Sequence, residues 1–406
     1  YAYGLDLAGA ILGVIFFSVL VSFGGVLGSP VIWFLVIGVA VLWLLRESGD
    51  KLAKVSACLV IVVCLIGVSA KDEIWSPYYS IKTKESDNKS LLIYVNQFFF
   101  QEALDFDENK VVKWKYLLPY HFSNPKNVLV LGSGSGNDVA TANSVGVSKI
   151  DAVEIDPVIV DLGKKYHPRS PYSNPNVKVY IDDARSFLNK SEEKYDMIIL
   201  GTLDSHALLS ARSTVRLDNF IYTLDSLVEV KNHLSDTGLA ILQFSAPNEE
   251  FGARLLKIAS KAFSDIPIVA YWGNNNLFNL AVIAGPGLTE KAIESLDTNL
   301  FVRLDIPKVK NISNLPTDDW PYLYLSERSI PEHYLIAIGI LLLISIVSIF
   351  ALIPKRKVIL SRASANFFLL GAAFLLLETK SITSLSLLFG STWVVNSFVF
   401  GSILVM

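Results

Sequence analysis

The residues of this sequence that could bind a ligand begin with three glycines at alternate positions, Gly132, Gly134 and Gly136, after the apolar run 128–131. Glycines let the backbone turn sharply and approach a ligand without a Cβ clash. Glu154 stands near the end of the next apolar run, where its carboxylate can accept hydrogen bonds from ribose hydroxyls. Strand, glycine turn, helix, strand and acid together predict a site for a nucleoside-type ligand. The alternative is a tight turn that binds nothing.

The glycine spacing indicates which nucleoside to expect. A dinucleotide fold uses G-x-G-x-x-G, and Asn137 occupies the position of its last glycine. The G-x-G-x-G found here is similar to the class I S-adenosylmethionine (SAM) fold, in which an acid after the third strand holds the adenine amine. This resemblance assigns that role to Asp183, which follows the third predicted strand, 177–181. Asn137 and Asp138 can cap the helix expected after the turn.

Asp204 and His206 are the predicted catalytic pair, because they follow the fourth predicted strand, 195–200. Open α/β sheets place their chemistry at the carboxyl ends of the strands, and a histidine near an acid can act as a base toward a hydroxyl or an amine. Two polar residues on a surface loop are the alternative. His167 and Arg169 could reach the same region, although solvated loop residues are the more frequent case.

These residues require an α/β domain to position them. The apolar runs predict a Rossmann-like sheet that is mostly parallel and has an antiparallel last strand, preceded by a small β-rich extension. Helices are predicted at 157–166, 217–233 and 250–263, and an antiparallel pair at 266–272 and 278–284. The predicted divisions are N-terminal transmembrane helices at 1–70, the β-rich extension at 71–126, the SAM-binding α/β domain at 127–330 and C-terminal transmembrane helices at 331–406.

Composition places the rest of the chain in a membrane. The 406 residues are 52% hydrophobic with a mean hydropathy of +0.45, which is too apolar for a wholly soluble protein. Runs of the length that crosses a bilayer gather at both ends. The candidate spans are 7–27, 30–45, 52–70, 333–353, 365–389 and a sixth that begins at 392. Because the first residue is Tyr1, both ends are expected to be cuts in a longer multi-pass protein.

The net charge of the chain and the distribution of its basic residues limit the binding partners and the location that can be expected. A net charge of −3 argues against nucleic acid, and no metal is expected, since Cys58 and Cys64 fall within an apolar span. The expected partners are the lipid bilayer, a small-molecule acceptor and other membrane helices. The loops 46–54 and 354–362 are richer in Lys and Arg than the flanks of the domain, which alone would place the domain outside the cell. SAM is made inside cells, so we expect the domain in the cytoplasm.

Several segments resemble spermidine synthases (polyamine aminopropyltransferases) over about residues 76–284. The matching motifs are SPYYSI, VLVLGSGSG, VEIDP and the DDA after the third strand. TDDWPYLYL and GAAFLLLETKS resemble the membrane-embedded branch of that family. The resemblance implies that the three glycines line the ligand, that Glu154 holds the ribose and that Asp183 holds the adenine. It also reveals departures, because Gly201 stands where the family has its general base, and Ser135 stands where it has an acid.

Loss of these acids affects the expected reaction, since desolvating a diamine without carboxylates is costly. We therefore predict a transferase that uses SAM or decarboxylated SAM on a small or membrane-associated acceptor, with methyl transfer favoured. A polyamine aminopropyltransferase with a rebuilt acceptor site is one alternative. A ligand-sensing or structural module that does not catalyse a reaction is another.

Overall fold

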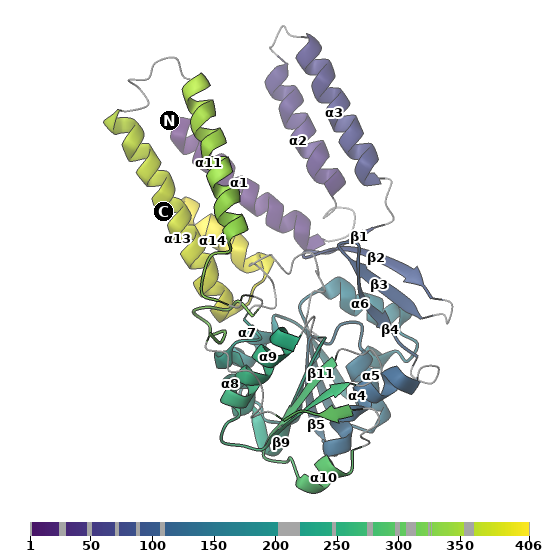
Figure 1. Ribbon diagram of the computed structural model, residues 1–406. Helices are drawn as coiled ribbons and strands as arrows, with labels where there is room; N and C mark the ends of the chain where they lie inside the picture. Colours follow the sequence, from purple (N-terminus) through teal and green to yellow (C-terminus); the bar gives the residue numbers. More distant parts are fainter. Residues whose placement is uncertain are drawn as a thin grey trace.

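The computed structural model describes residues 2–23, 30–46, 51–69, 73–86, 90–105, 110–201, 220–245, 249–273, 279–296, 301–305, 314–323, 325, 327–352 and 361–405. Their main body is an α/β domain, with a small antiparallel sheet on one side and a group of long apolar helices beyond one end (Figure 1).

The large sheet has eight strands in the order β12-β10-β11-β9-β8-β5-β6-β7. Strands β9, β8, β5, β6 and β7 are mutually parallel, whereas β11, β10 and β12 add an antiparallel edge. The predicted antiparallel pair at 266–272 and 278–284 is present as β10 and β11, whereas β12 is a further antiparallel strand that the sequence did not predict. The bounds are β5 Asn127–Leu131, β6 Lys149–Glu154, β7 Val177–Ile181, β8 Tyr195–Leu200, β9 Leu234–Ser245, β10 Ile268–Gly273, β11 Asn279–Ala284 and β12 Phe301–Arg303.

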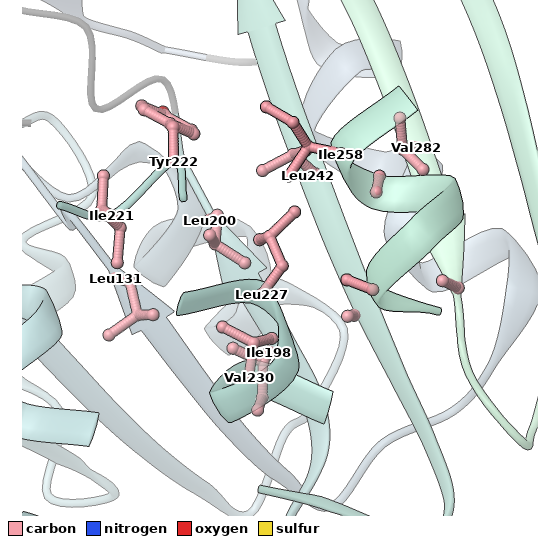
Figure 2. Packing of buried hydrophobic residues seen from close by; sticks show 14 of the residues in the cluster. Leu131, Ile198, Leu200, Ile221, Tyr222, Leu227, Val230, Leu242, Ile258 and Val282 are labelled. Atoms are coloured by element: carbon pink, nitrogen blue, oxygen red, sulfur yellow. The ribbon is translucent and has the colours of Figure 1, made fainter. Parts of the chain in front are cut away.

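Helices cover both faces of this sheet, so its central strands are apolar on both sides. Along β5, Leu129 and Leu131 join the core shared with α7, α8 and α9, whereas Val128 and Val130 join the core shared with α4, α5 and α6. Figure 2 shows part of the first of these cores, in which Leu131 of β5 is buried together with Leu227 and Val230 of α8. The helices are α4 Lys110–Phe122, α5 Asn137–Ser144, α6 Pro157–Tyr166, η1 Pro171–Ser173, α7 Ala184–Lys190, α8 Leu224–Asn232, α9 Glu249–Ala262 and α10 Glu290–Glu294.

The small sheet precedes the domain in sequence and packs on α6. Its strands β1 Ile74–Trp75, β2 Ser80–Glu85, β3 Leu91–Val95 and β4 Phe98–Ala103 are antiparallel neighbours in chain order. Ile81 and Ile93 are buried together with Ile159 and Leu162 of α6. The predicted β-rich extension is thus present, and it lies against the helix that follows Glu154.

Apolar helices occupy both ends of the chain: α1 Ala2–Phe23, α2 Pro30–Leu45, α3 Lys51–Ser69, α11 Glu332–Leu352, α13 Arg362–Phe389 and α14 Trp393–Val405. Within the residues that the structure describes, three segments could by length and composition cross a membrane: Gly4–Val21, Glu332–Ala351 and Arg362–Phe389. Their side chains are mostly exposed. Helix α14 packs against both α1 and α13 (Figure 1).

Candidate functional site

The glycine turn after β5 adopts a backbone that other residues rarely adopt. Gly132, Gly134 and Gly136 have φ values of 71°, 57° and 106°, all in the left-handed region that favours glycine. Gly132 N donates to Val153 O of β6 at 2.9 Å, which fixes the turn at the carboxyl end of the sheet. A Cβ on Gly163 of α6 would lie 2.3 Å from Ser135 O, so this helix approaches the turn at a distance that glycine permits.

Glu154, the last residue of β6, is bound to the same turn. Its Oε2 accepts from Gly134 N at 2.9 Å and its Oε1 from Asp156 N at 3.1 Å. The side chain is 8% exposed, and burial raises the pKa of its carboxyl to about 7 although these backbone donors oppose the rise. Since each carboxylate oxygen has a second lone pair, Glu154 can still accept hydrogen bonds from ribose hydroxyls.

Asp183, the predicted adenine residue, lies at the start of α7 and caps that helix. Its Oδ1 accepts from Ser186 N at 2.9 Å, and burial raises the pKa of the carboxyl. Its Oδ2 accepts from Ser391 N at 3.3 Å, in the turn between α13 and α14. A Cβ on Gly390 would lie 2.5 Å from Asp183 Cβ, so the turn between the two apolar helices contacts the predicted adenine residue directly.

The SPYYSI segment also reaches this end of the sheet. Ser76 Oγ accepts from the backbone N–H groups of Tyr78 and Tyr79 at 3.1 and 2.8 Å. Burial raises the pKa of the Tyr78 phenol, and the nearby carboxylates of Asp156, Asp183 and Glu154 add to that rise. The β extension therefore brings the aromatic side chain of Tyr78 close to Glu154 and Asp183, the two acids predicted to hold a nucleoside.

Asn137 and Asp138 do not cap α5, so that prediction was wrong. The N-cap is Gly136, with no side-chain hydrogen bond. Asn137 Oδ1 accepts from Leu104 N at 3.0 Å, and its Nδ2 donates to Glu102 O at 2.8 Å. These bonds tie the glycine turn to the end of β4, which is a tertiary role that local capping rules do not predict.

His167 is buried and bound, rather than solvated. Its Nδ1 accepts from Arg169 N at 3.1 Å, so Nε2 carries the proton that it shares with Asn137 Oδ1 at 3.1 Å. Burial lowers the pKa of His167 to about 4, in agreement with a neutral ring. We therefore assign His167 a structural role, in which its hydrogen bond to Asn137 stabilises the glycine turn.

The predicted catalytic pair, Asp204 and His206, lies outside the described residues. The loop that carries it begins after Gly201, whose N donates to Leu131 O at 3.1 Å. The structure places the carboxylate of Asp138 beside Gly201, whereas the sequence predicted that Asp138 caps a helix. A Cβ on Gly201 would lie 3.5 Å from Asp138 Oδ2. In the sequence, Asp138 can be recognised only as an acid in the first turn of the helix that follows the glycines.

Comparison with known proteins supports the resemblance of the α/β domain to spermidine synthases. Residues 117–270 match the family model for the spermine/spermidine synthase domain. The chain is 26% identical over 160 residues to the polyamine aminopropyltransferase of Thermoplasma volcanium, covering 37% of this chain and 55% of that protein. It is 29% identical over 153 residues to the enzyme of the same name from Alkaliphilus metalliredigens, covering 36% and 50%. The chain thus spans about half the length of these relatives.

Among solved structures, spermidine synthase from Thermotoga maritima superposes with a TM-score of 0.44 at 14% identity, over 66% of this chain and 87% of that one. Together, the glycine turn, the mostly parallel sheet and the matched residues define a Rossmann-like α/β domain. More particularly, the chain contains a spermidine synthase-like domain, flanked by candidate membrane-spanning helices.

Proposed function

We propose that the domain binds SAM or decarboxylated SAM and transfers an alkyl group from its sulfonium to a small or membrane-associated acceptor. The observation that carries the proposal is the joint geometry of the glycine turn and Glu154. The buried carboxylate is fixed 2.9 Å from Gly134 N, at the end of a parallel strand, where open α/β sheets bind nucleosides.

The residues present fit such a ligand at both ends of its nucleoside. Glu154 keeps lone pairs for two ribose hydroxyls, and Asp183 can accept an adenine amine beside its two backbone donors. When bound, the sulfonium supplies an activated carbon. The chain contributes the rest, because it holds the nucleoside, positions the acceptor and accepts a proton.

Methyl transfer is the reaction we favour, because it needs mainly positioning and one base. The resemblance to spermidine synthases leads us to expect acids at positions 201 and 135, but this chain has Gly201 and Ser135 there. Aminopropyl transfer is the second candidate. The carboxylate of Asp138 beside Gly201 favours it, since a rebuilt acceptor site needs an acid at that place.

The test is binding followed by turnover. Methylthioadenosine, SAM and decarboxylated SAM should bind the purified full chain in calorimetry, and Glu154→Ala should weaken binding by about 1–3 kcal/mol because buried polar groups lose their partners. Mass spectrometry of a reaction with cell extract should then show a product heavier by a methyl or an aminopropyl group. Absence of binding by all three nucleosides would contradict the proposal.

We also propose that the domain lies on the cytoplasmic face of the bilayer, with the apolar helices as its membrane anchor and its contact to any membrane partner. The three segments of spanning length support the membrane anchor, and the cytoplasmic side follows only from the proposed ligand, which is made inside cells.

A further inference from the structure

One face of helix α7 is covered by the end of helix α13. Asn189 Nδ2 of α7 donates to Leu387 O at 3.0 Å, and a Cβ on Gly390 would lie 3.2 Å from Ser186 Cβ. Positions 186 and 189 are three residues apart and are therefore neighbours on the surface of α7. The segment 387–391, which we call the α13–α14 turn, thus lies along α7 as far as the first turn of that helix.

At the start of α7, the α13–α14 turn holds the carboxylate of Asp183. Ser391 N donates to its Oδ2 at 3.3 Å, while Ser186 N donates to its Oδ1 at 2.9 Å. One oxygen is therefore held by α7 itself and the other by the α13–α14 turn, and together the two bonds fix the plane of the carboxylate. An acceptor that is already oriented loses less conformational freedom when a ligand binds.

The glycine at position 390 permits this close approach. Gly390 has a φ of 93°, which favours glycine, and a Cβ on it would lie 2.5 Å from Asp183 Cβ. Gly390 also ends α13, because its N donates to Ser386 O at 3.0 Å. The end of the apolar helix and its contact to the α/β domain therefore depend on the same residue.

Asp183 lies at the same edge of the sheet as Glu154. Strands β6 and β7 are parallel, Glu154 is paired with Ile181, and Asp182 N donates to Glu154 O at 3.2 Å. Burial raises the pKa of the Tyr78 phenol, and the charges of Asp183 and Glu154 both add to that rise, so the two carboxylates surround one region. A nucleoside bound there through its ribose and its base would contact a residue that the α13–α14 turn holds in place.

The α13–α14 turn also connects this region to the packing of the apolar helices. Helix α14 begins two residues after Ser391 and packs against α1 and α13. The buried side chains of α14 lie against partly buried side chains of α13: Val395, Val399 and Ile403 against Phe374, Ile382 and Leu385. Because the turn joins the two helices, a displacement of the turn must change how they pack.

We propose that the α13–α14 turn positions Asp183 for the base of the nucleoside, so that occupancy of the site and packing of the apolar helices are coupled. This rests on the proposed function, in which Asp183 accepts the adenine amine. Gly390 and Ser391 are positioning residues, since they act through Asp183. Coupling is reciprocal: a turn that strengthens nucleoside binding is itself held more firmly when the nucleoside is bound. The apolar helices thereby respond to the nucleoside.

The first test compares two nucleosides by calorimetry on the purified full chain: methylthioadenosine, and methylthioinosine, in which a carbonyl oxygen replaces the amine. The wild type should prefer methylthioadenosine. In Gly390→Ala the new Cβ displaces the turn from Asp183, so methylthioadenosine should bind at least about fivefold more weakly. Methylthioinosine should bind nearly as before, whereas a general loss of structure would weaken both. Gly371→Ala, the same change in the same helix with nothing within 4 Å of the Cβ, should keep both affinities.

A second variant approaches the contact from the α/β domain. Asn189→Ala removes the hydrogen bond to Leu387 O without altering either apolar helix, which keeps the inference testable if Gly390→Ala does not fold. It should weaken methylthioadenosine binding about threefold, the effect of one lost neutral hydrogen bond. Asp161→Asn, a change at an exposed ion pair of α6, should have no effect.

The reciprocal effect is measured at the α13–α14 turn itself. In a chain whose Cys58 and Cys64 are replaced by alanine, a single cysteine at Ser391 is allowed to react with a water-soluble maleimide. Methylthioadenosine should slow this reaction at least about fivefold. A cysteine at Ser361, at the other end of α13, should react at the same rate with and without the nucleoside.

The outcomes separate this inference from the proposed function. If methylthioadenosine does not bind the wild-type chain, the proposed function fails and the inference fails with it. The coupling alone is refuted, and the nucleoside site stands, if the wild type binds but Gly390→Ala and Asn189→Ala bind equally well. The same conclusion follows if Gly390→Ala weakens both nucleosides by one factor, or if the nucleoside leaves the reaction of the cysteine at Ser391 unchanged.

Discussion

If Glu154 holds the ribose as proposed, nucleoside binding should depend on the protonation of this carboxyl and therefore on pH. Burial raises the pKa of this carboxyl from 4.5 to about 7 in the folded chain. Because the folded pKa lies above the unfolded one, the contribution of Glu154 to stability is complete below about pH 4.5, where the group is protonated in both states. That contribution decreases as the pH rises through about 7, because the folded chain must then hold a buried charge.

A nucleoside bound in the proposed way should reverse this preference, since its ribose hydroxyls would donate to the ionised carboxylate. The ionised fraction of a group with a pKa of about 7 rises from about one tenth at about pH 6 to about nine tenths at about pH 8. If the ligand binds the ionised form, the Kd of methylthioadenosine should fall about tenfold over this range, which corresponds to about 1.4 kcal/mol. Stability and ligand affinity should therefore change in opposite directions.

Calorimetry in two buffers of different ionisation enthalpy measures both the Kd and the proton released. Glu154→Gln keeps the size of the side chain but does not titrate, so it should bind more weakly above about pH 7 and lose most of the pH dependence. Asp161→Asn should keep the wild-type profile. A Kd that stays constant between about pH 6 and about pH 8, or a Glu154→Gln profile that follows the wild type, would refute the assignment of Glu154 to the ribose.

Asp183→Ala removes the α7 cap and should lower the free energy of unfolding by about 1–2 kcal/mol in urea melts; an unchanged midpoint would contradict this. Gly163→Ala forces the glycine turn to shift from Ser135 O and should weaken methylthioadenosine binding at least about tenfold. Gly371→Ala, with nothing within 4 Å of the added Cβ, is its control and should bind normally. Of single cysteines placed at Ser191 and Ser361, an impermeant reagent outside intact cells should label the second. The reverse pattern would place the domain outside and count against SAM.

The sequence predicted the strands around the glycine turn well, for a physical reason. Strands β5 and β8 are buried along most of their length, so each is largely a continuous apolar run, whereas β7 at the edge of the sheet is only partly buried and contains Lys178. The runs 177–181 and 195–200 coincide with β7 and β8. The positive φ values of the three glycines follow equally from local sequence, because a turn of that shape excludes a Cβ.

The surroundings of Asn137 and Asp138 could not be predicted in this way, since their contacts join distant parts of the chain. Local rules assign an acid in the first turn of a helix to capping, yet Asp138 faces the backbone of Gly201 after β8. Asn137 likewise bonds Leu104 and Glu102 from the β extension. The antiparallel edge was underestimated for a related reason, because β12 is a short strand whose pairing with β10 depends on the register of the whole sheet.

The contact between Ser391 and Asp183 joins the two halves of the molecule, and its consequence is spatial. Asp183 follows β7, so it marks the carboxyl end of the parallel sheet, and Ser391 N donates to it at 3.3 Å from the turn that ends α13. Nearby, Asn189 Nδ2 donates to Leu387 O at 3.0 Å. The end of the sheet that carries the glycine turn, Glu154 and Asp138 therefore faces the apolar helices (Figure 1). If α13 crosses a bilayer, the site lies at the membrane surface, where it can receive a membrane-associated acceptor.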